Sequence, residues 1–553
     1  MATARDPAVA EAGVTPLRAV HRLGRALTRI LARGARSRPL TYAEWSARRA
    51  PSMRDLDEQR RMAGSLGWTP QFDVVVILRP GDSQAALRTT ASLAAQTYRH
   101  IAIHECLDAS AAGLNRAAAA GKGELLLFLD AGDLLAPQAL YSLAATGARN
   151  AGLLYSDEDV SGERPLFKPD WSPEALLSHD SVGGIAALRR ELFDAAGGFR
   201  DTGGAEWHDL LLRLLPRLLR VEHVPHPLLH RMAERPEPVD ALRRTISEHL
   251  RRAYGPDYRL CADGAIVYEP GAPARVSIVI PTRDRADLLR ACVESLDRQR
   301  CSARIELIVL DNGSVEPATH DYLRSLLQRQ GTKVLEYAAP FNWSAVNNFA
   351  ARQASGDYLL FLNNDVEALA PGWLDALLTF GSRPEIGAVG GLLLYPDGTV
   401  QHAGVVLGLT GYAGHVFAGR RPDEPTPFGR ANAIRDFTAV TGACMLVRRS
   451  LFEELGGFDE RFILCGSDVE FCLRLRARGL RNVVTPHARL LHHEAKTRGA
   501  DIPHSDFQHS FAAYEPYLRD GDHYYNPNLS LRDPSVALRD GPEDMLAFAR
   551  SFL

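Results

Sequence analysis

The chain has 553 residues, of which 46% are hydrophobic and 24% are charged, and its formal net charge is −3. These values are typical of a globular protein of about three to four domains, and the charge argues against nucleic acid as the main partner. The seven cysteines include no CxxC pair, which indicates reduced thiols in a cytosolic protein rather than disulfides or a zinc site. We expect no signal peptide and no membrane-spanning segment, since no apolar run approaches about 18 residues.

Residues 15–38 predict a basic amphipathic helix. The apolar side chains fall on one helical face, and arginines fill most of the remainder. One interpretation is a helix that lies on an anionic membrane surface. The other is a helix packed against its own protein, and the sequence leaves both open.

From Phe72 onward, apolar strands alternate with amphipathic helices. Strands are expected at 73–78, 101–105, 276–280 and 305–310, and helices at 85–96, 241–254 and 287–299. Alternation of this kind predicts an α/β fold with mostly parallel sheets.

The stretch 356–365, GDYLLFLNND, is an apolar run that stops at three polar residues. The run predicts a strand buried on both faces. In open α/β sheets, ligands bind where such strands end. A carboxylate at Asp365 can hold a divalent cation, and the cation can bind a diphosphate. The simpler interpretation is a polar turn that leaves the sheet.

The chain contains an internal repeat, with four matches in the same order. They pair SLAAQ (92–96) with SLDRQ (295–299), GELLLFLDAGDLLAP (123–137) with GDYLLFLNNDVEALAP (356–371), GGF (197–199) with GGF (456–458), and WHDLLLRL (207–214) with DVEFCLRL (468–475). The order predicts a duplicated fold.

The two copies differ at the strand ends. The second copy has Thr282, Arg283, Asp311, Asp365 and Asp468, where the first has Arg79, Pro80, Leu107, Gly132 and Trp207. Three carboxylates are thus replaced by side chains that can neither bind a cation nor accept a proton. We expect the first copy to keep the scaffold without the chemistry, and to bind the acceptor or to pack against the second copy.

Several motifs resemble inverting family 2 glycosyltransferases of the GT-A fold. They are VSIVIPTRDR (276–285), IVLDNGS (308–314), YLLFLNNDVE (358–367), GACMLVRRSLFEELGGFDERF (442–462), SDVEFCLRLRARG (467–479) and LLHHE (490–494). The stretches 155–180 and 524–531 resemble tandem, rhamnosyltransferase-like members that build bacterial polysaccharides.

The resemblance implies two tandem GT-A domains, the first degenerate. It implies inverting transfer of a sugar from a UDP- or dTDP-type nucleotide-sugar to a hydroxyl of a glycan or lipid-linked glycan, such as O-antigen or capsule. It also implies a divalent cation, Mg²⁺ or Mn²⁺. The expected location is cytoplasmic, with peripheral attachment to the inner face of the cell membrane left open.

The resemblance also implies roles for particular residues. Asp365 is the expected metal ligand, and Asn363 departs from the family's first acidic position. His493 is preferred over His492 as a second ligand, and a histidine that merely caps a strand end is the alternative. Asp468 is the expected base, although Ser467 replaces the family's glutamate and a helix N-cap role is also open. Donor contacts are expected from Thr282, Arg283, Asp311, Asn363 and Asn364, and acceptor contacts from Gly442 and Glu470.

The expected domain boundaries are a basic helical segment (1–68), a degenerate copy (69–235), a helix and linker (236–270), a catalytic copy (271–505) and a C-terminal tail (506–553). A two-site glycan polymerase and a non-catalytic glycan-binding scaffold are the alternative functions. A sugar nucleotidyltransferase is disfavoured, because no glycine-rich triphosphate loop follows the first strand.

Overall fold

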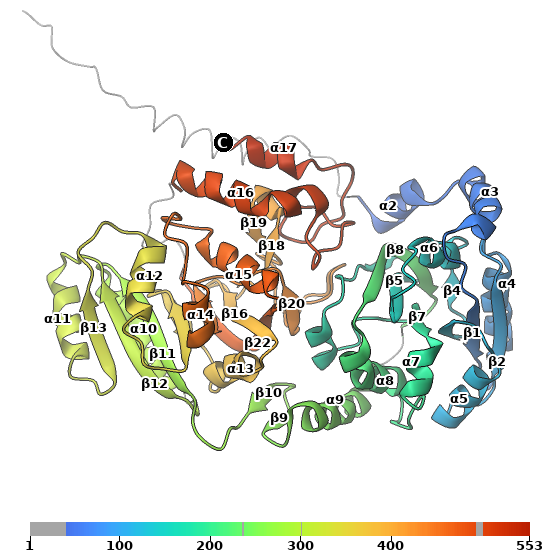
Figure 1. Ribbon diagram of the computed structural model, residues 1–553, viewed down its shortest axis with the longest axis horizontal. Helices are drawn as coiled ribbons and strands as arrows, with labels where there is room; N and C mark the ends of the chain where they lie inside the picture. Colours follow the sequence, from blue (N-terminus) through green and yellow to red (C-terminus); the bar gives the residue numbers. More distant parts are fainter. Residues whose placement is uncertain (1–39, 235–236, 300, 494–501) are drawn as a thin grey trace, which may run out of the picture.

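The computed structural model describes residues 40–234, 237–299, 301–493 and 502–553. Two mixed sheets with flanking helices lie side by side, the first half in blue to green and the second in yellow to orange (Figure 1). The α/β architecture is therefore confirmed. The basic segment 15–38 lies outside the described residues. Within the described ranges, no helix is long and apolar enough to cross a membrane.

The first sheet has eight strands in the order β2-β1-β3-β7-β5-β8-β4, with β6 beside β5. The strands are β1 (Phe72–Ile77), β2 (Ile101–Cys106), β3 (Leu125–Asp130), β4 (Leu134–Leu135), β5 (Leu153–Val160), β6 (Arg164–Leu166), β7 (Ala186–Arg189) and β8 (Val221–Arg231). The helices before and beside them are α2 (Tyr42–Arg49), α3 (Met53–Met62), α4 (Ser83–Ala94), α5 (Ala111–Ala119), α6 (Ala139–Ala145), α7 (Arg190–Ala195) and α8 (Glu206–Leu214).

The second sheet has ten strands in the order β13-β12-β11-β14-β21-β16-β22-β15, with β17 beside β16 and β20 beside β22. The strands are β11 (Arg275–Thr282), β12 (Arg304–Asp311), β13 (Thr332–Glu336), β14 (Tyr358–Leu362), β15 (Val366–Ala368), β16 (Ile386–Leu394), β17 (Val400–His402), β20 (Arg435–Phe437), β21 (Cys444–Arg448) and β22 (Arg481–His492). The helices are α10 (Ala286–Arg298), α11 (Pro317–Leu326), α12 (Trp343–Ala351), α13 (Trp373–Gly381), α14 (Arg449–Glu454), α15 (Ser467–Ala477), α16 (His504–Asp520) and α17 (Met545–Arg550).

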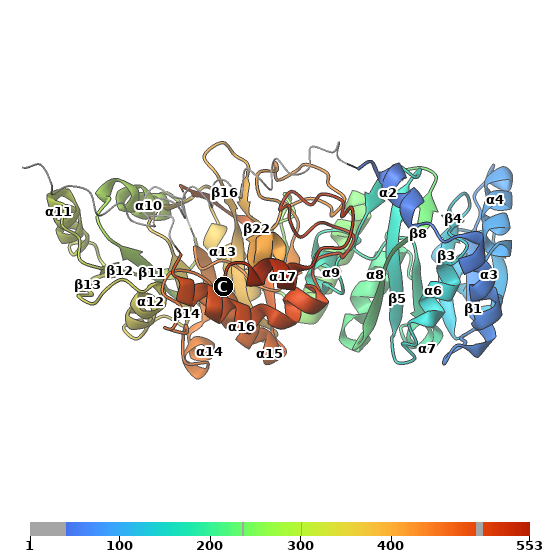
Figure 2. The ribbon, with the colours of Figure 1, turned by 90° about the horizontal axis from the view of Figure 1, so that it is seen from above.

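Smaller elements complete the chain. The helix α9 (Val239–Tyr254) and the hairpin of β9 (Tyr258–Leu260) and β10 (Ile266–Tyr268) connect the two halves. A second hairpin pairs β18 (Val405–Leu407) with β19 (Ala413–His415). Seen from above, α16 lies along the second half, and the chain that leads from it to α17 extends toward the first half (Figure 2).

The strand orders of the two sheets correspond position by position, from β2 and β12 through to β4 and β15, and β13 is added at one edge of the second sheet. In both, the first strands pair in parallel, whereas β7 and β21 run antiparallel to their neighbours. Apolar runs explain the central strands: Leu359 to Leu362 of β14 are at most 1% exposed. The correspondence supports the predicted duplication.

Side-chain contacts repeat between the copies as well. The side chain of Asn115 donates to the carbonyl of Phe199 and accepts from its backbone N–H. Phe199 is the residue that follows the two glycines of the first GGF turn. Asn348 does the same with Phe458 in the second copy. An asparagine amide can donate and accept at once, so one side chain can hold the turn in each copy.

Buried polar contacts join the two halves. Glu174, 2% exposed in the first half, lies 2.6 Å from Arg383 and 2.7 Å from Arg481 of the second. Asp157 of β5 accepts hydrogen bonds from the amide of Asn526 at 3.0 and 2.9 Å. Because one buried charge without its partner is costly, these contacts bind the halves into one unit.

Candidate active site

The carboxyl ends of β11 and β12 lie side by side, because the strands pair in parallel with Thr282 opposite Asp311. Both residues are buried, at 3% and 7% exposed. The Asp311 carboxylate accepts hydrogen bonds from the backbone N–H and the hydroxyl of Ser314 at 2.9 and 2.6 Å. Two of the predicted donor-binding residues are thus together at the edge where ligands bind in α/β sheets.

The loop after β11 is organised by Asp284, which sequence reasoning missed. Asp284 and Arg285 have φ angles of 54° and 55°, in the left-handed region that residues other than glycine rarely adopt. The Asp284 carboxylate accepts hydrogen bonds from the backbone N–H groups of Val315 and Glu316, at 2.7 and 2.9 Å. Burial disfavours the charged form, but these bonds prevail and hold the pKa of Asp284 below its usual value. Strained backbone of this kind clusters at functional sites.

Arg283, in the same loop, is exposed. Its guanidinium forms no ion pair with any residue that the structure describes. The side chain is therefore available at the rim of the site, and both predicted interpretations, ligand contact and solvated surface arginine, fit this position.

The three polar residues after β14 make different contacts. The Asn364 amide donates to Thr282 Oγ1 at 3.0 Å, which links the end of β14 to the end of β11. The backbone N–H of Asn363 donates to the carbonyl of Ala443 at 3.1 Å, just before β21. Asp365 is 4% exposed. Burial and then the charge of Asp365 raise the pKa of the nearby Cys292 thiol, which stays neutral.

The structure differs from the sequence-based preference for His493. The Nε2 atom of His492, the last residue of β22, lies 3.3 Å from Asp365 Oδ1. The His493 ring instead contacts Glu367 at 2.7 Å, and only its backbone N–H reaches Asp365, at the carbonyl oxygen. Consecutive residues of an extended chain point to opposite faces, so only one of the two rings can face Asp365. The geometry favours His492.

The Asp365 and His492 pair offers one carboxylate and one imidazole nitrogen to a cation. Among the described residues, no group of three or more His, Cys, Asp and Glu side chains is placed to hold a metal ion. Mg²⁺ commonly binds through one or two carboxylates together with substrate phosphates and water. The pair fits a cation of this kind, whose other ligands come from the substrate.

Asp468 lies in the first turn of α15, two residues after the N-cap Gly466. The N-cap alternative for Asp468 is therefore wrong. One carboxylate oxygen accepts from the backbone N–H of Gly442 at 2.7 Å, and the other from Val469 at 2.9 Å. Gly442 is followed by Ala443, which bonds to Asn363, so Asp468 lies next to the end of β14.

Residue 442 must be a glycine because the ring of Trp343 packs against its backbone. A Cβ atom at this position would lie 2.5 Å from the ring of Trp343, at the start of α12. Glycine therefore lets the indole pack directly on the backbone beside Asp468. Trp343 is a site residue that sequence reasoning missed, because it lies about a hundred residues away from Gly442 in the chain and carries no local signal.

The Glu470 carboxylate is engaged within the protein. It pairs with Arg474 at 2.8 Å, and Arg474 donates to the carbonyls of Leu455 and Gly457. The first copy contains the same arrangement, in which Asp209 pairs with Arg213 and Arg213 donates to Ala196 and Gly198. The first copy keeps this ion pair although it lacks the carboxylates aligned with Asp365 and Asp468, and in both copies the arginine binds carbonyls of the glycine turn. The geometry therefore favours a structural role for Glu470 over acceptor contact.

Residues of the C-terminal helix α16 hold the loop that precedes Asp468. Asp506 of α16 is fully buried, and its carboxylate accepts hydrogen bonds from the backbone N–H groups of Ile463, Leu464 and Cys465. The Tyr514 hydroxyl donates to the carbonyl of Gly466. The segment 506–553, expected as a C-terminal tail, thus includes residues that hold the loop leading into α15.

The corresponding positions of the first copy carry other chemistry. Gly132 has a φ of 104° and its N–H donates to Thr89. Asp130 pairs with Arg79 at 2.5 Å, and Leu107 is 78% exposed. The Trp207 ring lies 6.4 Å from those of Phe128 and Phe199. These residues offer neither a metal ligand in register nor a base.

Comparison with known proteins identifies the family of the chain. Residues 277–456 match the family model described as glycosyl transferase family 2. The N-acetylglucosaminyl-diphospho-decaprenol L-rhamnosyltransferase of Mycobacterium tuberculosis (strain CDC 1551 / Oshkosh) is 32% identical over 217 residues, 36% of this chain and 69% of that protein. The chain belongs to glycosyl transferase family 2. The predicted family is therefore confirmed.

Two further similarities extend over more of the chain. The O-antigen biosynthesis protein RfbC of Myxococcus xanthus is 45% identical over 461 residues, which cover 79% of this chain. The chain spans 36% of the length of RfbC, so the two proteins differ in extent. The solved structure of GalNAc-T7 with UDP, GalNAc and Mn²⁺ aligns with 52% of this chain and 55% of that one, at 16% identity and a TM-score of 0.38. That overlap is too low to add to the family assignment.

Proposed function

We propose that the chain transfers a sugar from a nucleoside-diphosphate sugar to a hydroxyl of a growing cell-surface glycan, with inversion, at one site in its second half. The observation that carries this proposal is that strand pairing and hydrogen bonds connect the loops that hold Asp311, Asp365 and Asp468. Asp311 lies opposite Thr282 at the ends of β12 and β11, and Asn364 donates to Thr282. Asn363 bonds to Ala443, and the preceding Gly442 donates to Asp468 of α15. Membership of the family supports the transferase chemistry.

In this proposal the donor lies across the ends of β11, β12 and β14. Asp311 binds the base or ribose of a UDP- or dTDP-type nucleotide, and Thr282 and Asn364 keep the neighbouring loops in register. Arg283 and Asn363 contact the donor from the rim. The exposed position of Arg283 and the hydrogen bond between Asn364 and Thr282 support these roles.

Asp365 and His492 would hold Mg²⁺ or Mn²⁺. When bound, the cation neutralises the charge that develops on the leaving diphosphate. Asp365 is suited to this role because its side chain is 5% exposed and lies beside His492 at the end of the buried strand.

Asp468 removes the proton from the acceptor hydroxyl, whose pKa is far above neutrality. The acceptor oxygen forms a bond to the anomeric carbon while the sugar–phosphate bond breaks, and its electron pair leaves with the diphosphate. The proton moves to the Asp468 carboxylate. The two backbone N–H groups that contact this carboxylate hold its orientation, and backside attack inverts the anomeric centre.

The cellular setting is part of the proposal. All seven cysteines are free thiols, which supports a reducing cytoplasmic location. The names of the two relatives support a bacterial surface polysaccharide and rhamnosyl-type transfer. Attachment to the inner face of the membrane through residues 15–38, next to a lipid-linked acceptor, completes the proposal.

The test uses the purified full chain with a panel of UDP-, dTDP- and GDP-sugars and a lipid-linked bacterial glycan. Release of nucleoside diphosphate that requires acceptor, stops with EDTA and returns with Mn²⁺ or Mg²⁺ is expected. Asp365→Ala should abolish it while circular dichroism stays unchanged, and NMR of the product should show the inverted anomer. Full release by Asp365→Ala, or a retained anomer, would contradict the proposal.

A further inference from the structure

A cavity of about 810 Å³ opens in the first half, at the carboxyl ends of β1 and β3. Arg79, Asp130 and Trp207 line it, and Asp130 and Trp207 are the residues aligned with Asn363 and Asp468 of the second half. The first copy has therefore lost the catalytic side chains but keeps a hollow at the corresponding place. Its volume falls within the range of about 300–1,000 Å³ that ligand sites usually have.

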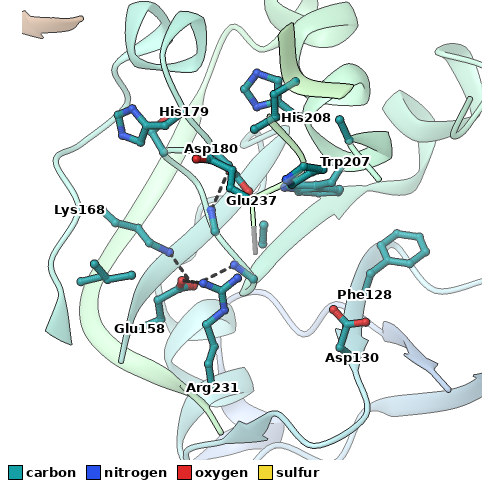
Figure 3. Close-up of a pocket in the computed structure, with 18 of the residues that line it drawn as sticks. Phe128, Asp130, Glu158, Lys168, His179, Asp180, Trp207, His208, Arg231 and Glu237 are labelled. Carbon is teal, nitrogen blue, oxygen red and sulfur yellow. Dashed lines mark hydrogen bonds and ion pairs between the residues drawn. The ribbon is translucent and has the colours of Figure 1, made fainter. Parts of the chain in front are cut away.

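The charges of the cavity disfavour a nucleoside diphosphate. Three of its cationic side chains are already paired within the wall: Arg79 with Asp130 at 2.5 Å, and Lys168 and Arg231 with Glu158 at 3.2 and 3.1 Å. Figure 3 shows Glu158 between Lys168 and Arg231 on one side of the cavity, across from Phe128 and Asp130. These three cations are not free to neutralise a diphosphate, and the fourth, Arg435, already donates to the carbonyls of Phe428 and Arg430.

The opposite edge of the cavity is acidic. Asp180 and Glu237 line it, and neither forms an ion pair within the described part of the chain. Partial burial and the charge of Asp180 raise the pKa of Glu237. Both side chains are exposed at this edge, and Asp180 also accepts hydrogen bonds from the backbone N–H groups of Val182 and Gly183. The two negative charges repel an anionic ligand, whereas a ligand with hydroxyl groups can donate to them.

The wall also contains donors that need an acceptor. Trp207 Nε1, Arg231 Nε and Arg435 Nε are buried, and none finds a hydrogen-bond acceptor among the described residues. A hydroxyl group both accepts from such donors and donates to carboxylates. The Trp207 indole, packed near Phe128, adds an apolar surface with a polar tip. Hydroxyl groups around a ring with an apolar face describe a saccharide.

We infer that this cavity is a second, non-catalytic glycan-binding site, which takes a saccharide segment of the acceptor. The inference rests on the proposed function for the identity of that acceptor. Residues 427–429 and Arg435 of the second half form part of the wall. A glycan bound here is therefore held against the half that carries the transfer site, and acceptors long enough to reach both sites bind more tightly than short ones.

The test measures binding apart from transfer. The full chain, without nucleotide or metal, is applied to an array of oligosaccharides from bacterial surface polysaccharides, and the strongest binder is titrated by calorimetry. Trp207→Ala removes the indole, and the double variant Asp180→Asn/Glu237→Gln changes only exposed side chains. Asp194→Asn, an exposed change in the same half but outside the cavity, is the matched control.

We expect both cavity variants to weaken binding at least tenfold, by the loss of stacking and of hydrogen-bond acceptors, and the control to bind as the unaltered chain does. No binding to any glycan of the array, or binding by either cavity variant that is as tight as that of the unaltered chain, overturns the inference. Loss of UDP or dTDP binding in the double variant would make the cavity a nucleotide site and overturn it too. Transfer is assayed separately, so glycan binding without nucleoside diphosphate release leaves this inference standing while the proposed function fails.

Discussion

Asp468→Asn tests the proposed role of this carboxylate as the base separately from its structural role. The substitution keeps the size of the side chain and removes its ability to take a proton. A positioned general base contributes about a hundredfold to ten-thousandfold in rate. Since each tenfold is about 1.36 kcal/mol, the expected rise in the activation free energy is about 3–5 kcal/mol. We therefore expect kcat to fall by this factor, with little change in the KM for the donor.

The structural cost of the same change follows from two hydrogen bonds. The carboxylate accepts from the N–H groups of Gly442 and Val469, and an asparagine oxygen can accept from only one side of the amide. One backbone N–H therefore loses its partner, at a cost of about 1–3 kcal/mol in the free energy of unfolding. Thermal unfolding should show a small drop in Tm and a folded protein at assay temperature.

Glu470→Gln is the matched control, two residues further along α15. It weakens the ion pair with Arg474 but leaves Asp468 and its contacts intact. We expect a lower Tm and a transfer rate close to that of the unaltered chain. Nucleoside diphosphate release under saturating donor and acceptor measures both variants. A near-normal kcat for Asp468→Asn, or an equal loss in Glu470→Gln, would refute the assignment of Asp468 as the base.

Three further changes test the scaffold. Gly442→Ala places a Cβ 2.5 Å from the Trp343 ring, so we expect lower activity and lower Tm, whereas unchanged kinetics would show that the indole moves freely. Glu174→Ala leaves Arg383 and Arg481 without this carboxylate, and urea unfolding should show a free energy of unfolding lower by about 3–5 kcal/mol. Glu269→Ala, which breaks an exposed ion pair, is the control and should lower it far less. Burial and the charge of Arg252 lower the pKa of His249 to about 4. The unfolded chain therefore binds a proton that the folded chain does not, stability falls as the pH drops from about 6.5 to about 4, and His249→Gln should lessen the loss of Tm between those values.

Much of the fold is predictable because its signals are local. Apolar runs mark β11, β12 and β14, and β14 spans Tyr358–Leu362, as the polar residues on either side predict. The predicted apolar face of α10, with Leu288, Leu289 and Leu296, is buried against the sheet. The sheets are nevertheless mixed, since the direction of β7 and β21 depends on how long connections return to the sheet and not on the strands themselves.

The residues that sequence reasoning missed act over long separations. Asp284 ties two loops together across the strand ends, Asp506 holds a loop about forty residues before it, and Trp343 packs on Gly442 from another helix. A Thr-Arg-Asp sequence after a strand and a lone aspartate in a C-terminal helix carry no periodic or motif signal. Only the packed chain reveals their partners.

What the sequence determined by itself is the position of the candidate site. The in-register comparison of GDYLLFLNND with GELLLFLDAGD predicts a metal carboxylate at Asp365 and aligns it with a glycine of the first copy, because register along a strand is a property of chain order. Tertiary structure decided which way individual side chains point and which residues pack against them. It turned His492 rather than His493 toward Asp365, tied Glu470 to Arg474, and left the first copy a cavity whose wall has buried donors without an acceptor among the described residues. These arrangements depend on which face each side chain takes and on what the rest of the chain brings against it.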